Sequence, residues 1–399
     1  MNLFLKRAWA EVDLDAIEAN YLTLANKLPK NTKIMAVIKA NANNCGDISI
    51  VKLLDKYERV SYAVSNLEEA ITVRKTGTDK MILILGYTPP HLAKYLNKYN
   101  ITQAIVSYEY ACDLIRYCKE TNIIVDVNIK LDTGMSRIGL MCYDEYLNQA
   151  LNQCKNIASS KYLDISGVFT HIATFYDLDE DSTNFTNLQY KRFCHFVHEF
   201  EKSGISLGIK HCCNSPGTVN HPEMACDMVR IGTALLGGLT DNYMIEKVDL
   251  KPSLNVKTVV AHVKSVKKGT YFGYSRSYCA PTDMKVATLP IGYSDVCRIG
   301  SGEGVVLINS VRCKVIGGVC MDQMIVDVSN LQNVKMGDEV ILLGKMGTEE
   351  IGLSEFGEFM AASPEEVYCH LTKRLQTVYI KNKKPSYFIK FSADIGYFD

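Results

Sequence analysis

The sequence predicts an α/β protein in which a (β/α)8 TIM barrel is followed by a C-terminal, mainly β domain. Two patterns support this prediction. Apolar runs alternate with amphipathic stretches over about the first 240 residues, and β-rich runs with few helices between them follow. A chain of 399 residues also exceeds what one hydrophobic core usually serves. We therefore expect a barrel domain over residues 1–248 and a β domain over residues 249–399.

The barrel prediction rests on the number and spacing of its strands. Eight short, β-branched runs lie at residues 34–38, 60–64, 81–85, 104–107, 123–131, 165–170, 209–213 and 228–231. A first helix is expected over residues 14–28, and later helices over 48–57, 67–75, 93–99, 110–119, 146–156 and 188–203. Alternating strands and helices imply parallel pairing with right-handed crossovers, and eight such units match the usual size of this barrel.

The β domain is predicted from a change of pattern after Pro252. Its β-rich runs lie at residues 254–266, 286–291, 305–308, 314–316, 325–328 and 340–343. The turns between them carry Gly or Asp, which is typical of antiparallel sheets. One helical patch, over residues 364–375, interrupts the strands.

Composition narrows the classes of partner. Lys and Arg number 44 and Asp and Glu number 44, so no net charge attracts nucleic acid or an anionic membrane, and we expect a small-molecule partner. No apolar run is long enough to span a bilayer, and the N-terminus is too short and too soon charged for a secretory signal. Fourteen cysteines without regular spacing predict reduced thiols in a cytoplasmic protein and no metal site.

The residues expected at the barrel's active face point to a phosphate-bearing cofactor. Active sites of this fold lie at the carboxyl ends of the strands, and the first strand ends in Lys39. A lysine there can be a solvated surface residue or a nucleophile for a carbonyl cofactor. The loops after strands seven and eight, which often bind phosphate, offer the Ser215 hydroxyl and the amides of Gly232 and Thr233. Together these features predict a pyridoxal 5′-phosphate (PLP) site.

Two further polar residues lie in apolar strands. Lys130 belongs to the fifth strand and should need a partner if it is buried. His171 follows the sixth strand and presents an imidazole at the rim. A single histidine of this kind is often a core residue rather than a catalytic one.

Motifs in both predicted domains resemble those of the alanine racemase family and occur in the family's order. The similarity runs from Trp9 almost to the C-terminus. The matching segments are residues 36–42 (AVIKANA), 130–139 (KLDTGMSRIG), 169–174 (FTHIAT), 214–215 (NS), 228–232 (MVRIG), 273–274 (GY), 290–295 (PIGYSD) and 320–323 (CMDQ).

This resemblance implies a fold-type III PLP enzyme that racemises alanine, built as a head-to-tail homodimer with shared active sites. Lys39 would carry the cofactor and act as one base, and Tyr274 from the partner subunit would act as the other beside His171. Racemisation needs two bases because a proton leaves one face of Cα and another returns to the opposite face. Arg137 would meet the cofactor phenolate or the substrate carboxylate, oriented by a carbamylated Lys130.

The resemblance also implies the remaining contacts of the site. An arginine at the pyridine nitrogen would leave the ring unprotonated, which limits side reactions such as transamination. The implied cofactor contacts are Asn214, Ser215, Arg230, Gly232 and Thr233, with Arg230 at that nitrogen. The implied substrate-entrance residues are Tyr293, Met321, Asp322 and Glu365.

Two departures from the family pattern leave the substrate open. Asn43 and Glu365 stand where the family usually has tyrosines, one reaching the phosphate and one narrowing the pocket. Alanine stays the default substrate, with serine, another polar amino acid or a basic amino acid as alternatives. A PLP-binding homologue that is catalytically silent or repurposed is a further alternative. A decarboxylase is the last, because Cys320 could serve as its catalytic cysteine.

Overall fold

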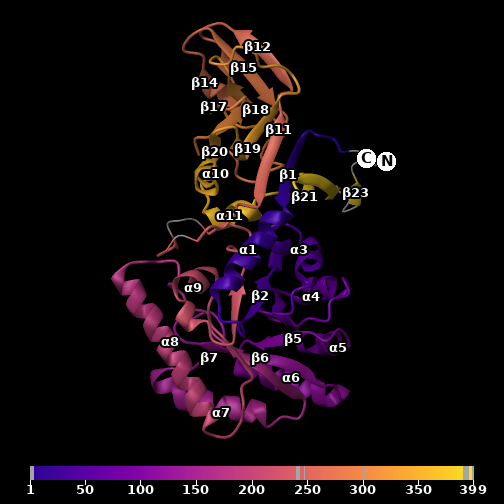
Figure 1. The fold of residues 1–399 in the computed structure, drawn as a ribbon, viewed down its shortest axis with the longest axis vertical. Coiled ribbons are helices and arrows are strands. Elements are labelled where there is room, and N and C mark those ends of the chain that lie inside the picture. The colour runs from indigo at the N-terminus through magenta and orange to yellow at the C-terminus, as the bar shows by residue number, and fades with distance from the viewer. Residues whose placement is uncertain (1–3, 240–242, 247, 301, 390–394, 398–399) are drawn as a thin grey trace. The chain divides into compact units, whose positions relative to one another are not determined.

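The computed structural model describes residues 4–239, 243–246, 248–300, 302–389 and 395–397 (Figure 1). The chain forms two compact units, which we describe separately. The barrel unit comprises Glu18–Lys251, and the β unit comprises Met1–Ile17 together with Pro252–Asp399. Across the described ranges, no helix is long and apolar enough to cross a membrane.

Eight parallel strands form the barrel in the order β10-β2-β3-β4-β5-β6-β8-β9 within the described part of its unit. They are β2 (Lys33–Val37), β3 (Val60–Val64), β4 (Ile82–Ile84), β5 (Thr102–Ile105), β6 (Val125–Asp132), β8 (Leu163–Phe169), β9 (Ile209–His211) and β10 (Met228–Ile231), and the short β7 (Leu140–Met141) pairs with β6. The end strands are linked by hydrogen bonds from the Asp227 amide to the Lys210 carbonyl (3.0 Å) and from the Arg230 amide to the Cys213 carbonyl (2.9 Å). The barrel is therefore nearly closed, and the predicted fold class is confirmed.

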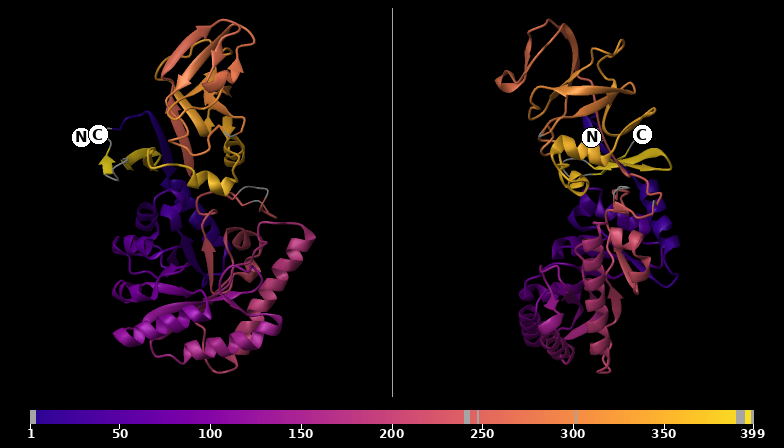
Figure 2. Two further views of the ribbon diagram at one scale, coloured as in Figure 1. Left: turned by 180° about the vertical axis from the view of Figure 1, so that it is seen from behind. Right: turned by 90° about the vertical axis from the view of Figure 1, so that its left-hand side faces the viewer.

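Side chains fill the barrel interior, and helices cover its outside. Parallel strands are buried on both faces, which is why these runs are almost continuously apolar. One interior cluster consists of Met35, Ala63, Leu83, Ala104, Phe169 and Met228. Figures 1 and 2 show the helices around the strands: α1 (Leu14–Lys27), α2 (Lys39–Asn43), α3 (Asp47–Leu54), α4 (Leu67–Arg74), α5 (Ala93–Lys98), α6 (Tyr108–Thr121), α7 (Leu147–Ala158), α8 (Glu180–Glu201) and α9 (Ser215–Asn220).

Side-chain caps explain where the outer helices begin. Asn66, Ser107 and Asp179 each accept a backbone N–H in the first turn of α4, α6 and α8, respectively. Helix α8 begins at Glu180, well before the predicted residue 188. Its first two turns contain a single apolar residue, Phe185, so the apolar periodicity that predicts a helix appears only later in the segment.

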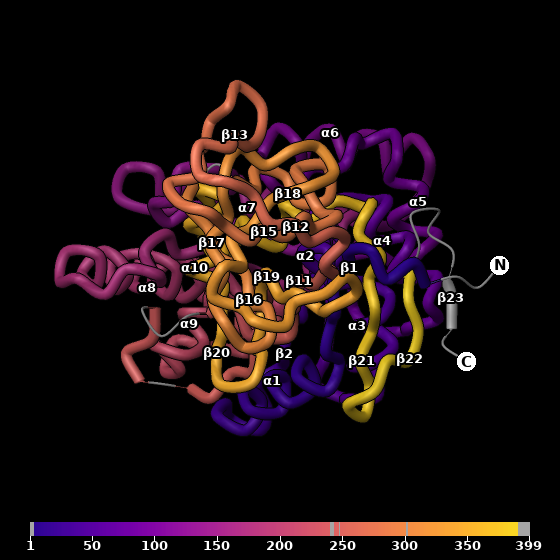
Figure 3. The backbone as a smooth tube through the Cα atoms, turned by 90° about the horizontal axis from the view of Figure 1, so that it is seen from above, coloured from indigo at the N-terminus to yellow at the C-terminus, as the bar shows by residue number. Residues whose placement is uncertain are grey.

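The β unit is built on one long sheet in the order β12-β15-β18-β17-β16-β19-β11-β1-β21-β22-β23, and β20 pairs with β19. Figure 3 shows the run from β16 to β22 in this order. The strands are β1 (Ala8–Asp13), β11 (Leu254–Val259), β12 (His262–Val266), β15 (Met284–Leu289), β16 (Val305–Ile308), β17 (Val311–Ile316), β18 (Met324–Asp327), β19 (Glu339–Met346), β20 (Glu349–Ile351), β21 (Gln376–Lys381), β22 (Lys384–Ile389) and β23 (Ile395–Tyr397). A hairpin of β13 (Tyr271–Phe272) and β14 (Tyr278–Cys279) and the helices α10 (Leu353–Met360) and α11 (Pro364–Cys369) complete the described part.

A strand that was not predicted forms near the N-terminus. We assigned residues 1–248 to the barrel domain, but β1 pairs antiparallel with β11 and parallel with β21, so it belongs to the β unit. Trp9 packs there with Val378 and Phe388. The domain of a strand is decided by the strands to which it hydrogen-bonds. The partners of β1 lie more than 240 residues further along the chain.

Several other boundaries in the β unit also differ from the predictions. The run over residues 254–266 forms two strands, because the chain leaves the sheet between Val259 and His262. The helical patch over residues 364–375 is helical only over α11, since the Thr372 amide donates instead to the Asp295 carbonyl (2.9 Å). Helix α10 and strands β21 and β22 were not predicted.

A buried carboxylate ties the N-terminal segment to the rest of the β unit. The Asp295 side chain has no exposed surface. Arg7 donates to both of its oxygens, with one N–O distance of 3.0 Å, and Arg374 Nε lies 3.6 Å from Oδ1. The Gly292 amide donates to Oδ2 (3.2 Å). A buried charge requires such partners, so this group fixes the loop over residues 290–295.

We predict that Arg7→Ala lowers the free energy of unfolding of the β unit by about 2 kcal/mol. A hydrogen bond to a charged group contributes roughly 1.5–3 kcal/mol, but Arg7 is partly exposed and Arg374 remains near the carboxylate. Urea denaturation measures the change, and Lys6→Ala, at the exposed neighbouring position, is the matched control. Equal stability of the two variants would contradict this role of Arg7.

Candidate active site

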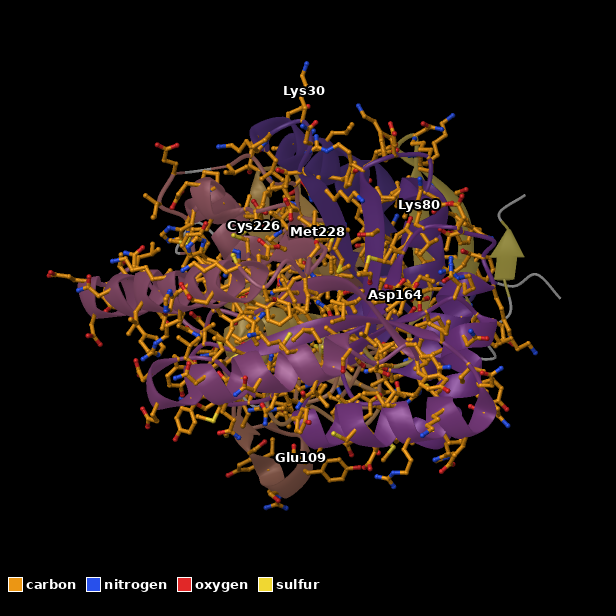
Figure 4. All side chains as sticks on the ribbon, turned by 90° about the horizontal axis from the view of Figure 1, so that it is seen from below. Lys30, Lys80, Glu109, Asp164, Cys226 and Met228 are labelled. Atoms are coloured by element: carbon orange, nitrogen blue, oxygen red, sulfur yellow. The ribbon has the colours of Figure 1, made fainter. Side chains whose placement is uncertain are left out.

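Most of the predicted site residues of the barrel unit lie at the carboxyl ends of its strands. Lys39 follows β2, Lys130 lies near the end of β6, His171 follows β8, Ser215 comes after β9, and Arg230 is in β10. Because these strands are parallel, their carboxyl ends meet at one rim. Figure 4 looks from below and labels two residues of the opposite, amino ends, Met228 of β10 and Asp164 of β8.

A left-handed turn follows Lys39. The five residues 40–44 have φ between +51° and +62°, although none of them is glycine. The turn is closed by hydrogen bonds from the Ala42 amide to the Ile38 carbonyl (2.8 Å) and from the Asn44 amide to the Ala40 carbonyl (3.0 Å). Left-handed helical backbone costs roughly 1–2 kcal/mol per L-residue, so this segment stores strain. Strain of this kind gathers at functional sites.

The Lys39 side chain is exposed in the single chain. The left-handed turn beyond it was not predicted from the sequence. Only the pair Asn43-Asn44 hinted at it, since asparagine tolerates the left-handed region better than most residues. The arrangement places an accessible amine on a rim segment with a fixed and strained backbone.

Arg230 is a buried cation held by neutral acceptors. Its guanidinium donates to the carbonyls of Thr170 (2.8 Å), His211 (3.1 Å) and Cys212 (3.1 Å). It lies 5.4 Å from the centre of the Phe169 ring. Among the residues that the structure describes, its Nε–H has no hydrogen-bond partner, so one donor remains for another molecule.

Two histidines beside Arg230 are neutral. Burial, and then the positive charge of Arg230, hold the pKa values of His171 and His211 well below their ordinary range. His211 Nδ1 faces the guanidinium at 3.1 Å and must accept, so its Nε2 carries the proton. The Asn128 side-chain nitrogen lies 3.1 Å from this Nε2. Because that proton needs an acceptor, turning the Asn128 amide by 180° would present its oxygen to the ring.

This chain of hydrogen bonds fixes the guanidinium from the barrel interior. Asn128 and His211 were not predicted as site residues from the sequence. Both are fully buried polar residues of barrel strands, and such residues need a partner. His171 Nδ1 also accepts from Arg230, at 3.3 Å. The other nitrogen of His171 then carries its proton.

Lys130 is buried next to the same guanidinium. Its Nζ donates to the Leu131 carbonyl (2.7 Å) and lies 5.5 Å from the centre of the Phe169 ring. Burial, and then the charge of Arg230, lower the pKa of Lys130 to about 7, against a partial offset from Asp132. The partner that the sequence predicted for this lysine is thus a carbonyl rather than a carboxylate.

The loop after β6 presents Arg137. The Asp132 carboxylate accepts hydrogen bonds from the amides of Gly134 (2.9 Å) and Ser136 (3.1 Å), which shapes this loop. Arg137 follows and is exposed, without a hydrogen bond among the residues described. The rim therefore presents a free guanidinium near the buried cations of β6 and β10.

The residues that we expected to bind phosphate lie after β9 and β10. Asn214 caps α9 by accepting the Gly217 amide (3.0 Å). The Ser215 hydroxyl oxygen accepts the amides of Gly232 (3.0 Å) and Ala234 (3.1 Å). The Gly232 amide, expected to bind phosphate, thus donates to Ser215. The hydroxyl proton of Ser215 remains available to an anion.

The remaining predicted residues lie on exposed loops of the β unit. Tyr274 follows β13, Tyr293 follows β15, and Met321 and Asp322 lie between β17 and β18. Their exposed fractions are 77% for Tyr274, 44% for Tyr293 and 52% for Met321, which leaves an unusual group of large side chains open in the single chain.

Backbone contacts bring two of these loops together. The Tyr293 amide donates to the Cys320 carbonyl (3.2 Å), and the Ser294 amide donates to the Met321 carbonyl (3.1 Å). A Cβ on Gly292 would lie 2.2 Å from the Cys320 carbonyl oxygen, so only glycine fits this approach. The Arg374 guanidinium donates to Asp322 (2.7 Å), which fixes the side chain of the second loop.

Glu365 lies in the first turn of α11 and has an unusual environment. Its Oε1 is buried and has no hydrogen-bond partner within the described ranges. Its neighbour Glu366 instead forms a capping box with Ser363. A buried carboxylate oxygen without a donor is costly, so a donor from outside the chain, such as a ligand, a water or another chain, would stabilise it.

Comparisons with known proteins cover almost the whole chain. The family model for the N-terminal domain of alanine racemase matches residues 12–240, and that for its C-terminal domain matches residues 253–379. An alanine racemase of Clostridium perfringens is 36% identical over 386 residues, which is 96% of this chain and 98% of that relative.

Solved structures show the same similarity. The alanine racemase of Clostridium difficile has a TM-score of 0.88 and 30% identity, covering 98% of this chain and 100% of that one. A histidine racemase from Leuconostoc mesenteroides has a TM-score of 0.83 and 27% identity, covering 95% of this chain and 100% of that one. Similar architectures therefore belong to racemases with different substrates.

Proposed function

Because this chain belongs to the alanine racemase family, we propose that it is an isomerase that interconverts L- and D-alanine with PLP held at Lys39. The observation that carries this proposal is the barrel rim. An accessible lysine after β2 shares that rim with the Ser215 hydroxyl and the free Nε–H of Arg230. The fourteen cysteines of the chain all lie in the described ranges and form no disulfide there, which suits a reducing compartment such as the cytoplasm.

The residues at the rim fit PLP chemically. The Ser215 hydroxyl proton, with the Thr233 hydroxyl and amide, would hold the phosphate, and Arg230 would donate its Nε–H to the pyridine nitrogen. When bound, PLP accepts the electrons released as the substrate Cα loses its proton. Arg230 remains charged, because its partners in the described residues are neutral acceptors, so it favours an unprotonated ring nitrogen.

Two bases on opposite faces of the substrate follow from the proposed chemistry. The Lys39 amine would exchange the proton on one face, and the Tyr274 phenol of the partner subunit would do so on the other. Tyr274 projects from an exposed loop of the single chain, which is how a residue that completes the site of a second copy would lie. We therefore propose a homodimer with shared sites, as the sequence predicted.

We also propose that Lys130 is carbamylated. Addition of CO2 to its neutral amine, with release of one proton, converts a buried cation into an anion. The lowered pKa of Lys130 supplies the neutral amine, and the charges of Arg230 and Arg137 nearby stabilise an anion there. The carbamate would then orient Arg137 toward the cofactor phenolate or the substrate carboxylate.

A second candidate is a racemase for a polar or basic amino acid. The buried Glu365 Oε1 lacks a donor, and a substrate hydroxyl or ammonium could supply one. Asn43, in the left-handed turn, likewise offers less bulk than the tyrosine usual in the family. The structural similarity to a histidine racemase shows that this architecture admits substrates other than alanine.

Replacement of the proposed bases tests the racemase. Lys39→Ala should abolish loss of optical rotation from L-alanine, and Tyr274→Phe should lower kcat by about 10²–10⁴-fold, the usual contribution of a positioned acid or base. Lys30→Ala, another exposed lysine of the barrel unit, is the control. Wild-type rates in Lys39→Ala would contradict the proposal, and CO2 release from the substrate would favour a decarboxylase.

Carbamylation should depend on pH through Lys130 itself. Below a pKa of about 7 the amine is protonated and cannot add CO2, so less carbamate forms as the pH falls. With ¹³C-bicarbonate, the carbamate NMR signal should weaken between about pH 8 and pH 6 and be absent in Lys130→Met. An unmodified mass for wild-type protein at high bicarbonate would refute the modification.

Glu365 should control the choice of substrate. Glu365→Tyr should shift the ratio of kcat/KM for serine over alanine toward alanine by about 10–200-fold, the range of a single pocket group. Racemisation of alanine, serine, lysine, ornithine and histidine is compared, with the exposed Glu358→Gln as control. An unchanged ratio would show that Glu365 does not line the pocket.

A further inference from the structure

The carboxylate of Glu69 joins the ends of two neighbouring barrel strands. Its Oε1 accepts the Ala40 amide (2.8 Å) and its Oε2 accepts the Ser65 amide (2.8 Å). These amides lie just beyond β2 and β3, which run in parallel register and share a bond from the Ile38 amide to the Ala63 carbonyl (2.9 Å). Ionised acceptors form stronger hydrogen bonds than neutral ones. We call this pair of bonds from the Ala40 and Ser65 amides to Glu69 the clamp.

Helix α4 holds Glu69 in place for this role. Its N-cap residue, Asn66, accepts the Glu69 amide at 3.0 Å. A glutamate at the third helical position usually turns back to the N-cap amide. Glu69 instead bonds to the amide one residue earlier, that of Ser65, and reaches across to β2. The positive end of the helix dipole stabilises the carboxylate charge.

The clamp acts at the start of the strained turn. Ala40 is the first of the five left-handed residues and directly follows Lys39. At the far end of the turn, the Asn41 side chain accepts the Asp47 amide (3.1 Å) and the Asn41 carbonyl accepts the Gly46 amide (2.9 Å). With both ends held, the backbone cannot release its strain by rotating the peptide after Lys39.

We propose that Glu69 is a positioning residue that sets the direction of the Lys39 side chain at the rim. This inference rests on the proposed function of Lys39 as the PLP-bearing base. Glu69 bonds to the backbone beyond Lys39 and not to the lysine amine, so it acts through the peptide. The role needs two acceptor oxygens, which explains a carboxylate here. An amide in its place would offer one acceptor and one donor to two N–H groups.

The test compares Glu69→Gln and Glu69→Ala with Glu68→Gln. Glu68 is the adjacent, exposed glutamate of the same helix turn, and among the described residues its side chain makes no hydrogen bond to the rim. Full-length protein loaded with PLP is assayed for racemisation. We expect kcat to fall by about 10–100-fold in both Glu69 variants with little change in KM, because small misplacements of a reacting group carry costs of this size.

Two measurements without turnover accompany the kinetics. The affinity of the cofactor-free protein for PLP, followed by absorbance, should fall in both Glu69 variants and stay unchanged in Glu68→Gln. Amide hydrogen exchange at residues 39–46 should accelerate in the Glu69 variants, while the remaining barrel amides keep wild-type protection. If Glu69→Ala fails to fold, Glu69→Gln carries the comparison.

Wild-type kcat and PLP affinity in Glu69→Gln would overturn the inference. So would a uniform loss of protection across the barrel, because Glu69 would then serve only general stability. If the wild-type protein racemises no amino acid, the proposed function fails, yet PLP affinity and local exchange still report on Glu69. The two failures are therefore distinguishable.

Discussion

The charge on Arg230 sets the electrostatics of the barrel rim. A buried cation without a carboxylate is costly, and this one is stabilised by three carbonyls and two imidazoles at the carboxyl ends of β8 and β9. Those bonds join the last strands where the barrel closes. Burial, and then the charge of Arg230, lower the pKa values of His171, His211 and Lys130. The rim is thus a region of excess positive potential, suited to a ligand that carries phosphate and carboxylate groups.

Much of the fold could be predicted from the sequence because its signals are local. Eight apolar runs with helices between them appear in the structure as eight strands in parallel order. The placement of β1 could not be predicted, since its partners lie at the far end of the chain. The left-handed turn over residues 40–44 could not be predicted from the sequence either. Two alanines and three asparagines carry no strong signal for φ values near +55°, and the clamp that holds them comes from a different helix.

The candidate site likewise contains residues that could be predicted from the sequence and residues that could not. Lys39, Ser215 and Arg230 could be placed by the rule that barrel sites lie at the carboxyl ends of strands, and the structure brings them to that rim. The hydrogen bond from the Gly232 amide to the Ser215 hydroxyl could not be predicted, because it depends on the direction of the Ser215 side chain. Asn128 and His211 could have been found by asking what satisfies a polar residue inside an apolar strand. Substrate choice rests on a few side chains such as Glu365, and neither fold nor family fixes these.

The exposed loops that carry Tyr274, Tyr293 and Met321 have a consequence for how the protein behaves in solution. Under the proposed homodimer, a single chain is folded yet holds only part of each active site. Activity per chain then follows mass action: dilution below the dissociation constant of the dimer silences the enzyme without unfolding it. The concentration of the protein in the cell would then control its turnover. A small molecule that covers these loops would inhibit the enzyme without entering the site at Lys39.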